Sequence, residues 1–251
     1  MEKKLKSWQG WLLFGGTMVV VFVLGMIAAS VNERHAEVTS VMNNKKTEIT
    51  GIEARNDKFE PNYPREYQTW EATADTSFKS LYNGNQAVDV LEARPEMVIL
   101  WAGYAFSKDY STPRGHMYAI EDMRNTLRVG APMTENEGPQ PATCWTCKSP
   151  DVPRMMQAMG VDNFYKGKWA SLGKEIVNPI GCADCHEPEN MNLHISRPAL
   201  IEAFQRQGKD ITKATQQEMR SLVCAQCHVE YYFKGDGKYL TFPWDKGSTV
   251  E

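Results

Sequence analysis

The chain has 251 residues and a formal net charge of −3 at pH 7, with 42% hydrophobic and 24% charged residues. Its length allows one large domain or two small ones, and its composition is ordinary for a globular protein. The slightly acidic balance gives no reason to expect nucleic acid as a partner.

The N-terminus carries an export signal. A lysine-rich start, residues 1–6, precedes an uncharged and largely apolar run from Trp11 to Ala29, which is about long enough to span a bilayer. The positive flank keeps the N-terminus in the cytoplasm and sends the remainder across, into the periplasm or its equivalent. We expect residues 1–30 to anchor the protein in the membrane. A cleaved signal peptide is the alternative, because Ala28-Ala29-Ser30 offers the small residues of a cleavage site.

The remainder divides into a polar tether, residues 31–64, and a domain, residues 65–251. Prolines close the tether, and strand signals beyond it are scarce. We therefore expect a mainly α domain with little β structure. Short helices are predicted over residues 76–81 and 88–94, and longer ones over residues 118–127, 151–159, 197–206 and 211–222.

All six cysteines fall in three C-x-x-C pairs, within the segments Cys144–Lys148, Cys182–His186 and Cys224–His228. The second and third segments are C-x-x-C-H motifs, which attach c-type haem through two thioethers and place the last residue beneath the iron. Zinc or disulfides are alternatives, but neither requires the trailing Lys, His and His. We therefore predict three haems in a haem-packed core. Their attachment residues are Cys144, Cys147, Cys182, Cys185, Cys224 and Cys227, and their proximal ligands are Lys148, His186 and His228.

The lysine in the first motif predicts unusual axial chemistry. To bind iron, the Lys148 amine must lose its proton, which burial and the charge of the metal favour. We expect this haem to keep a free distal face for substrate, whereas haems with two histidine ligands relay electrons. The alternative is a degenerate motif without haem. His116 is the best candidate for a distal ligand, with a core histidine as the alternative, while His35 and His194 have no supporting context.

Five segments closely resemble the ammonia-forming cytochrome c nitrite reductase family, and the likeness extends from about Trp101 to Trp244. They are Arg114–His116, Arg124–Arg128, Cys144–Asp151, Gly181–His186 and Cys224–Phe233. The lysine of the first motif and the Glu-Tyr-Tyr after the third are together highly specific. The resemblance implies a multihaem cytochrome c fold and a periplasmic enzyme with five haems that reduces nitrite to ammonium with six electrons.

The resemblance also implies roles for single residues. Lys148 would be the proximal ligand of the active-site haem, and His116 the distal ligand of the third haem. Arg128 and Tyr231 would line the substrate pocket, and Glu230 would bind calcium together with the Tyr231 carbonyl. These roles suit the residue types, because an arginine keeps its charge for anion capture and a carboxylate is a hard ligand for calcium. The alternatives are a haem-propionate partner for Arg128 and an ordinary surface carboxylate for Glu230.

The chain departs from the family at its end, because the family continues well beyond Glu251. The continuation carries two further haem motifs, the catalytic histidine, the remaining calcium ligands, the distal ligand of the second haem and the helices of the usual homodimer. We therefore expect an N-terminal part of a longer protein, which alone does not sustain nitrite reduction and whose full form takes electrons from a quinol-linked cytochrome. The alternatives are a membrane-anchored electron-transfer cytochrome and a related multihaem enzyme acting on hydroxylamine or another oxyanion.

Overall fold

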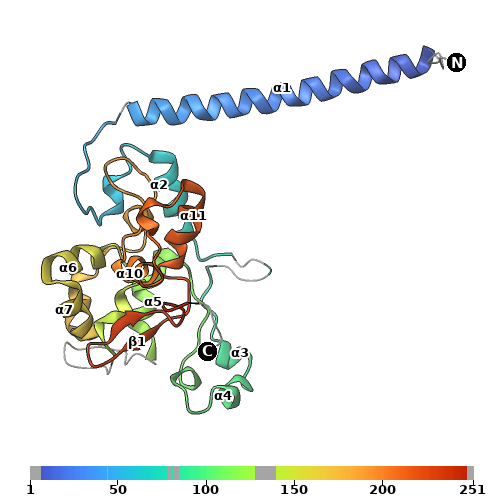
Figure 1. The fold of residues 1–251 in the computed structure, drawn as a ribbon. Helices are drawn as coiled ribbons and strands as arrows, with labels where there is room; N and C mark the ends of the chain where they lie inside the picture. The colour runs from blue at the N-terminus through green and yellow to red at the C-terminus, as the bar shows by residue number, and fades with distance from the viewer. Residues whose placement is uncertain (1–6, 44, 79–80, 82–84, 128–139, 248–251) are drawn as a thin grey trace. The chain divides into compact units, whose positions relative to one another are not determined.

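The structure, a computed structural model, describes residues 7–43, 45–78, 81, 85–127 and 140–247 (Figure 1). Contacts divide the chain into two units, Met1–Lys46 and Thr47–Glu251. The α-helices are α1 (Ser7–Asn43), α2 (Pro64–Glu71), α3 (Val90–Ala93), α4 (Met97–Leu100), α5 (Ala119–Asn125), α6 (Asp151–Met159), α7 (Val161–Lys166), α8 (Trp169–Leu172), α9 (Cys182–Cys185), α10 (Pro198–Arg206) and α11 (Gln216–Ala225). The 3-10 turns are η1 (Asn56–Lys58), η2 (Ala72–Ala74), η3 (Ala105–Ser107), η4 (His116–Tyr118), η6 (Ala142–Trp145), η7 (Gly173–Glu175) and η8 (Ile211–Lys213), and the strands are β1 (Tyr232–Lys234) and β2 (Tyr239–Thr241).

The first unit is dominated by α1. An 18-residue window within Ser7–Ser40 has a mean hydropathy of 2.4, so the helix is long and apolar enough to cross a membrane, which a signal sequence can equally be. The predicted apolar helix is therefore present. It continues past residue 30 to Asn43, because no glycine or proline occurs in residues 31–50 to end it.

The segment predicted to be a tether, residues 31–64, is not one element in the structure. Its first part is the end of α1, and its last part folds with the second unit. There the Asn62 side chain accepts a hydrogen bond from the Thr47 amide at 3.0 Å and donates one to the Thr47 carbonyl at 2.7 Å. Phe59, nearby in the chain, is fully buried. The folded domain therefore begins near Thr47 instead of residue 65.

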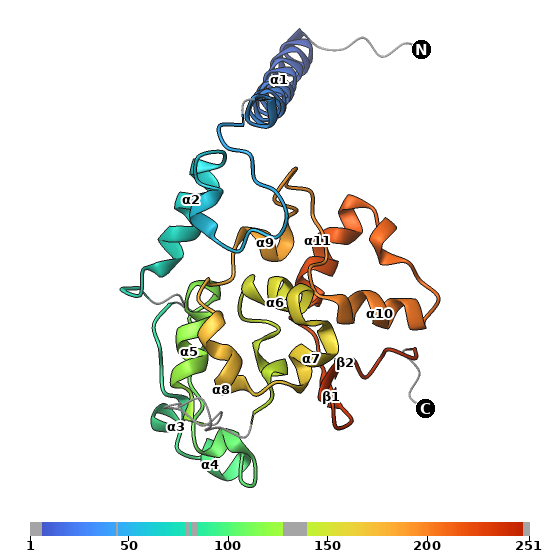
Figure 2. The ribbon, with the colours of Figure 1, turned by 90° about the vertical axis from the view of Figure 1, so that its left-hand side faces the viewer.

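The second unit is mainly helical around a core of side chains. At its centre the rings of Trp145 and Trp169 stack, with centroids 4.9 Å apart and planes 5° from parallel. Both side chains are almost completely buried. Residues of α6, α7, α10 and β2 belong to the same buried cluster, and Figure 2 shows these elements near one another. The core is completed by Val152, Met155, Phe164, Tyr165, Ala199, Leu200, Leu240 and Phe242. Because Trp145 lies inside the first cysteine motif, this core anchors that motif directly.

Helix α6 has the predicted bounds. Asp151 in its first turn suits the positive end of the helix dipole. Gly160, at φ +86°, takes a left-handed conformation that ends α6 and lets α7 begin at the next residue. Helix α10 begins with Pro198 at its first position, one residue later than expected, where a missing N–H costs nothing.

Other predicted helices differ from the structure. The helix expected from residue 211 begins at Gln216, because Thr215 and Glu218 cap it with reciprocal hydrogen bonds. Residues 76–78 and 81, expected to be helical, are not. The helix expected over residues 88–94 is the shorter α3, and that over residues 118–127 is α5.

The short hairpin connects two of the cysteine motifs. Strand β1 follows the third motif and pairs antiparallel with β2, Tyr232 lying opposite Thr241. Two left-handed residues, Gly235 and Lys238, form the turn. The Lys238 carbonyl accepts a hydrogen bond from the Thr143 hydroxyl at 2.7 Å, at the start of the first motif. The chain that leaves the third motif therefore returns to the first.

Replacing Trp145 with alanine removes one stacked ring from a site with no exposed surface. We expect the free energy of unfolding to fall by about 3–5 kcal/mol, the usual cost of truncating a buried tryptophan. Urea denaturation followed by circular dichroism measures it. Ile99→Ala is the control, because Ile99 is 80% exposed. Equal losses in the two variants would contradict the role of Trp145 as the centre of the core.

Candidate functional site

Each cysteine pair lies on a single tight turn. In the second motif the His186 amide bonds to the Cys182 carbonyl at 2.9 Å, and in the third the His228 amide bonds to the Cys224 carbonyl at 2.8 Å. These are helical hydrogen bonds, so the two cysteines of each pair, three residues apart, lie on one face of the turn. All six thiols are free. Two free thiols on one face, followed at once by a nitrogen ligand, fit the attachment of a haem.

The first motif is the most deeply embedded. Thr146 and Trp145 are fully buried, whereas Cys144, Cys147 and Lys148 are half-buried. Burial raises the pKa of Cys144 to about 11, and the positive charge of Lys148 opposes this shift. The motif therefore presents its two thiols and its amine from a rigid base.

The first and third motifs meet at their second cysteines. A hydrogen bond from the Cys227 thiol lowers the pKa of Cys147, and the same contact raises the pKa of Cys227. The two pairs are 80 residues apart in the sequence, from Cys144 to Cys224. Their attachment points are therefore adjacent in space, which suits electron transfer between the groups that they would carry.

His116 lies opposite His228, the last residue of the third motif. Their ring centroids are 6.1 Å apart and their planes are inclined by 43°. Two imidazoles bound to one metal ion at about 2 Å per bond have centroids roughly 6 Å apart. Burial lowers the pKa of His116, and the neighbouring His228 lowers it further, which favours the neutral ring that binds metal. The pair fits an iron held between the two rings.

His186 is oriented for a metal by the chain that follows it. Its Nδ1 lies 2.8 Å from the Met191 carbonyl, and because a carbonyl only accepts, Nδ1 carries the proton. Nε2 is thereby left with a free lone pair for iron. Met191 has φ +60°, which turns the loop back towards His186. The Nε2 atom of His194 instead lies 3.4 Å from the Ala183 carbonyl, and burial lowers the pKa of His194.

The remaining predicted residues are only partly described. Arg128 lies outside the described residues. Tyr231 is 45% exposed and stacks on Phe233, with ring centroids 5.8 Å apart, and Glu230 beside it is exposed. Within the described part of the chain, no three His, Cys, Asp or Glu side chains cluster as metal ligands would. The structure thus brings His116 and His228 together, and the charge of Lys148 acts on His116, while the predicted calcium ligands stay at the surface.

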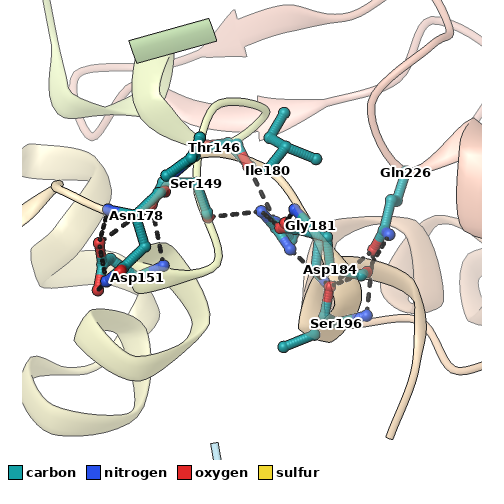
Figure 3. A network of polar contacts seen from close by, with 12 residues as sticks. Thr146, Ser149, Asp151, Asn178, Ile180, Gly181, Asp184, Ser196 and Gln226 are labelled. Atoms are coloured by element: carbon teal, nitrogen blue, oxygen red, sulfur yellow. Dashed lines mark hydrogen bonds and ion pairs between the residues drawn. The ribbon is translucent and has the colours of Figure 1, made fainter. Parts of the chain in front are cut away.

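Sequence reasoning missed the residue on which the three motifs converge. Arg197 is almost completely buried, and its guanidinium donates to the Thr146 carbonyl at 2.9 Å and the Ser149 carbonyl at 2.7 Å. It also pairs with the Asp184 carboxylate of the second motif at 2.5 Å. Burial would lower the pKa of Arg197, but Asp184 outweighs this and raises it. The first two motifs are therefore joined by one buried cation. Figure 3 shows Thr146 and Ser149 of the first segment near Asp184 of the second motif.

The third motif joins the same network through Gln226. Its Oε1 accepts from the backbone amides of Ser196 and Arg197, both at 3.1 Å, and its Nε2 donates to the Asp184 carbonyl at 2.8 Å. Figure 3 shows Gln226, Ser196 and Asp184 grouped together. A variable position of the second motif and one of the third are thus occupied by side chains that hold the network. The only signal in the sequence was Arg197 directly before Pro198, which indicated no more than a helix start.

A second network ties the chain after the first motif to the chain before the second. Asp151 is buried, and its Oδ2 accepts from the amides of Val177 and Asn178, both at 2.9 Å. The Ser149 hydroxyl donates to the Asn178 carbonyl at 2.6 Å. The left part of Figure 3 shows Ser149, Asp151 and Asn178 in contact. The segment that contains Lys148 is therefore fixed at its far end as well.

The second motif is also held from the N-terminal side, by residues before and within α2 (Figure 2). The Asn56 Oδ1 accepts from the Cys182 amide at 3.0 Å, and Trp70 donates to the Ile180 carbonyl at 2.9 Å. Gly181 is required here, because a Cβ at this position would lie 1.9 Å from Asn56 Oδ1. An open surface depression of about 440 Å³ lies along α2, lined by Arg65, Glu66, Thr69, Trp70 and Thr73.

Three cysteine turns, each followed by a lysine or histidine and mounted on a mainly helical fold, are typical of a multihaem c-type cytochrome. The chain belongs to the cytochrome c552 family, whose profile matches residues 55–251. Cytochrome c-552 of Parabacteroides distasonis is 99% identical to it over 251 residues, and cytochrome c-552 of Bacteroides fragilis is 77% identical. The chain spans about half of these curated relatives, 51% of each.

A solved structure supports the same assignment. The cytochrome c nitrite reductase of Desulfovibrio desulfuricans superposes with a TM-score of 0.72 and 32% sequence identity. The match covers 80% of this chain and 46% of that one, and that protein is described as having two calcium sites in its catalytic subunit. The resemblance to the nitrite reductase family and the predicted fold class are thereby confirmed.

Asp184→Asn leaves the buried charge of Arg197 without its counterion. We expect the free energy of unfolding to fall by about 3–5 kcal/mol, the usual cost of breaking a buried ion pair by removing one partner. Asp210→Asn, at an exposed ion pair with Lys213, is the control and should stay close to the wild-type value. Urea denaturation of both variants measures the difference, and a small loss at Asp184 would contradict the importance of the pair.

Proposed function

We propose that the chain is part of the catalytic subunit of a cytochrome c nitrite reductase, which reduces nitrite to ammonium with six electrons. The observation that carries the proposal is Lys148, in place of histidine after the first cysteine pair. The likeness to a solved nitrite reductase supports it. Three haems belong to this chain in the proposal and five to the whole protein, as the family resemblance implies.

The cysteine pairs would hold the haems, and each ligand has its own task. Haem iron supplies a redox-active centre whose potential depends on its axial ligands. Lys148 would bind the first iron on one face and leave the other free for nitrite. His116 and His228 would occupy both faces of the third iron, which their 6.1 Å separation suits. His186 would bind the second iron through Nε2, with Nδ1 held by Met191.

Arg128 and Tyr231 would act on the substrate. Nitrite is an anion, and cleaving its N–O bonds requires protons and stabilisation of negative charge on oxygen. The Arg128 guanidinium, which keeps its charge, would bind and orient the anion. The Tyr231 hydroxyl would donate a hydrogen bond near the iron. Glu230 and the Tyr231 carbonyl would hold calcium, whose charge would act on Tyr231 in turn.

The same proposal covers location and partners. The domain would lie in the periplasm, with α1 as its membrane anchor or, alternatively, as a cleaved signal peptide. Electrons would come from a quinol-linked cytochrome, and the full-length protein would form a homodimer. A second candidate is an electron-transfer cytochrome that is anchored in the membrane and only relays electrons, which the apolar α1 favours. Lys148 opposes it, because a relay has no use for an open iron face.

Lys148→His tests the special role of the first haem. The variant should still attach haem through Cys144 and Cys147, but the altered axial ligand should change its potential and spectrum. We expect kcat for nitrite to fall by at least about tenfold, equivalent to about 1.4 kcal/mol. Steady-state rates and absorption spectra measure both effects.

In the wild-type protein, a high-spin haem that shifts on addition of nitrite supports the enzyme, whereas haems that are all low-spin and unaffected by nitrite support the relay.

His116→Ala tests the ligation of the third haem. Removal of the distal ring opens one face of the iron, so we expect one low-spin haem to become high-spin while the first haem keeps its spectrum. Electron paramagnetic resonance of the oxidised protein detects the change. His35→Ala is the matched control, because His35 lies in α1. If the two variants give identical spectra, His116 is not a ligand.

A further inference from the structure

Arg197 donates hydrogen bonds to the backbone on both sides of Lys148. Its Nε donates to the Thr146 carbonyl at 2.9 Å and its Nη2 to the Ser149 carbonyl at 2.7 Å. Only Cys147 and Lys148 lie between these two carbonyls. One rigid, planar group therefore fixes both ends of the short segment that carries a thioether cysteine and the lysine ligand.

Arg197 is itself held by the other two motifs, its guanidinium by the second and its backbone amide by the third. Asp184, between the cysteines of the second motif, pairs with Nη2 at 2.5 Å. The Ser196 hydroxyl accepts from Nη1 at 2.6 Å and donates to the Asp184 carbonyl at 2.7 Å. Gln226, between the cysteines of the third motif, accepts from the Arg197 amide. A single residue, Arg197, thus fixes the position of the Lys148 segment relative to the second and third motifs.

We propose that Arg197 is a positioning residue for Lys148, which holds the amine at the first iron and sets the ligation of that haem. The proposal rests on haem binding at the first motif, which is part of the proposed function. Its physical reason is that Lys148 has a long, flexible side chain, so its reach to iron is defined only if its backbone is fixed. A displacement of about 1 Å in a positioned group can cost a hundredfold in rate.

Arg197→Lys in the haem-loaded protein is the main test. Lysine keeps the charge and can reach Asp184, but it lacks the planar fork that spans both carbonyls. We expect haem on all three motifs, a second population in the paramagnetic resonance spectrum of the first haem, and unchanged spectra of the other two. Backbone hydrogen exchange of residues 143–151 should be faster, and kcat for nitrite should fall roughly tenfold or more with little change in KM. Arg220→Lys, at an exposed arginine on α11, is the matched control.

Ser196→Ala is the second variant, and it decides the question if Arg197→Lys fails to fold or to attach haem. It removes one support of the guanidinium without touching the buried charge, and exposed Ser171→Ala is its control. A smaller change of the first-haem spectrum in the same direction supports the proposal. Unchanged spectra in the folded variants overturn it, as does an equal disturbance of all three haems, which would indicate a general structural role. A full-length wild-type protein with haem at Cys144 and Cys147 but no nitrite turnover would end the proposed function and leave the spectral test valid.

Discussion

A buried guanidinium has no water to stabilise its charge, so its hydrogen-bond acceptors must come from the protein. The arrangement of the cysteine motifs depends on how Arg197 obtains these acceptors. Four hydrogen bonds from its side chain reach two backbone carbonyls, one hydroxyl and one carboxylate. Arg197 is 1% exposed, so little water screens its pairing with Asp184. Because these acceptors lie 13 to 51 residues away or adjacent to it, the full set of hydrogen bonds can form only when the first and second motifs have come together.

Haem attachment at the motifs could be predicted because it depends on short sequence patterns. A cysteine pair followed by His186 or His228 needs no tertiary contact to be recognised, and the substitution of Lys148 stands out against the other two. Arg197 could not be found in this way. Two of its acceptors are backbone carbonyls, which every residue possesses, so no side chain in the sequence marks them as partners. Its distance from Thr146 in the chain removes the remaining local signal.

The boundary between the two units lies before the predicted start of the domain for a related reason. Residues 47–63 look polar in the sequence, and polar residues before a pair of prolines indicate a linker. In the structure these polar side chains form hydrogen bonds within the fold. Asn62 bonds to the Thr47 backbone, and Asn56 bonds to the Cys182 amide of the second motif. Asparagine can satisfy an amide and a carbonyl with one side chain. A polar composition therefore indicated solvent exposure where the residues serve as internal ties.

The position of that boundary bears on how the protein can be processed. Every contact described for the cysteine motifs begins at or after Thr47, while the apolar helix belongs to a unit that ends at Lys46. A peptidase cut anywhere within the first unit would leave the hydrogen bonds of the second unit intact. If α1 acts as the proposed anchor or signal peptide, anchored and released forms of the domain would thus share one fold.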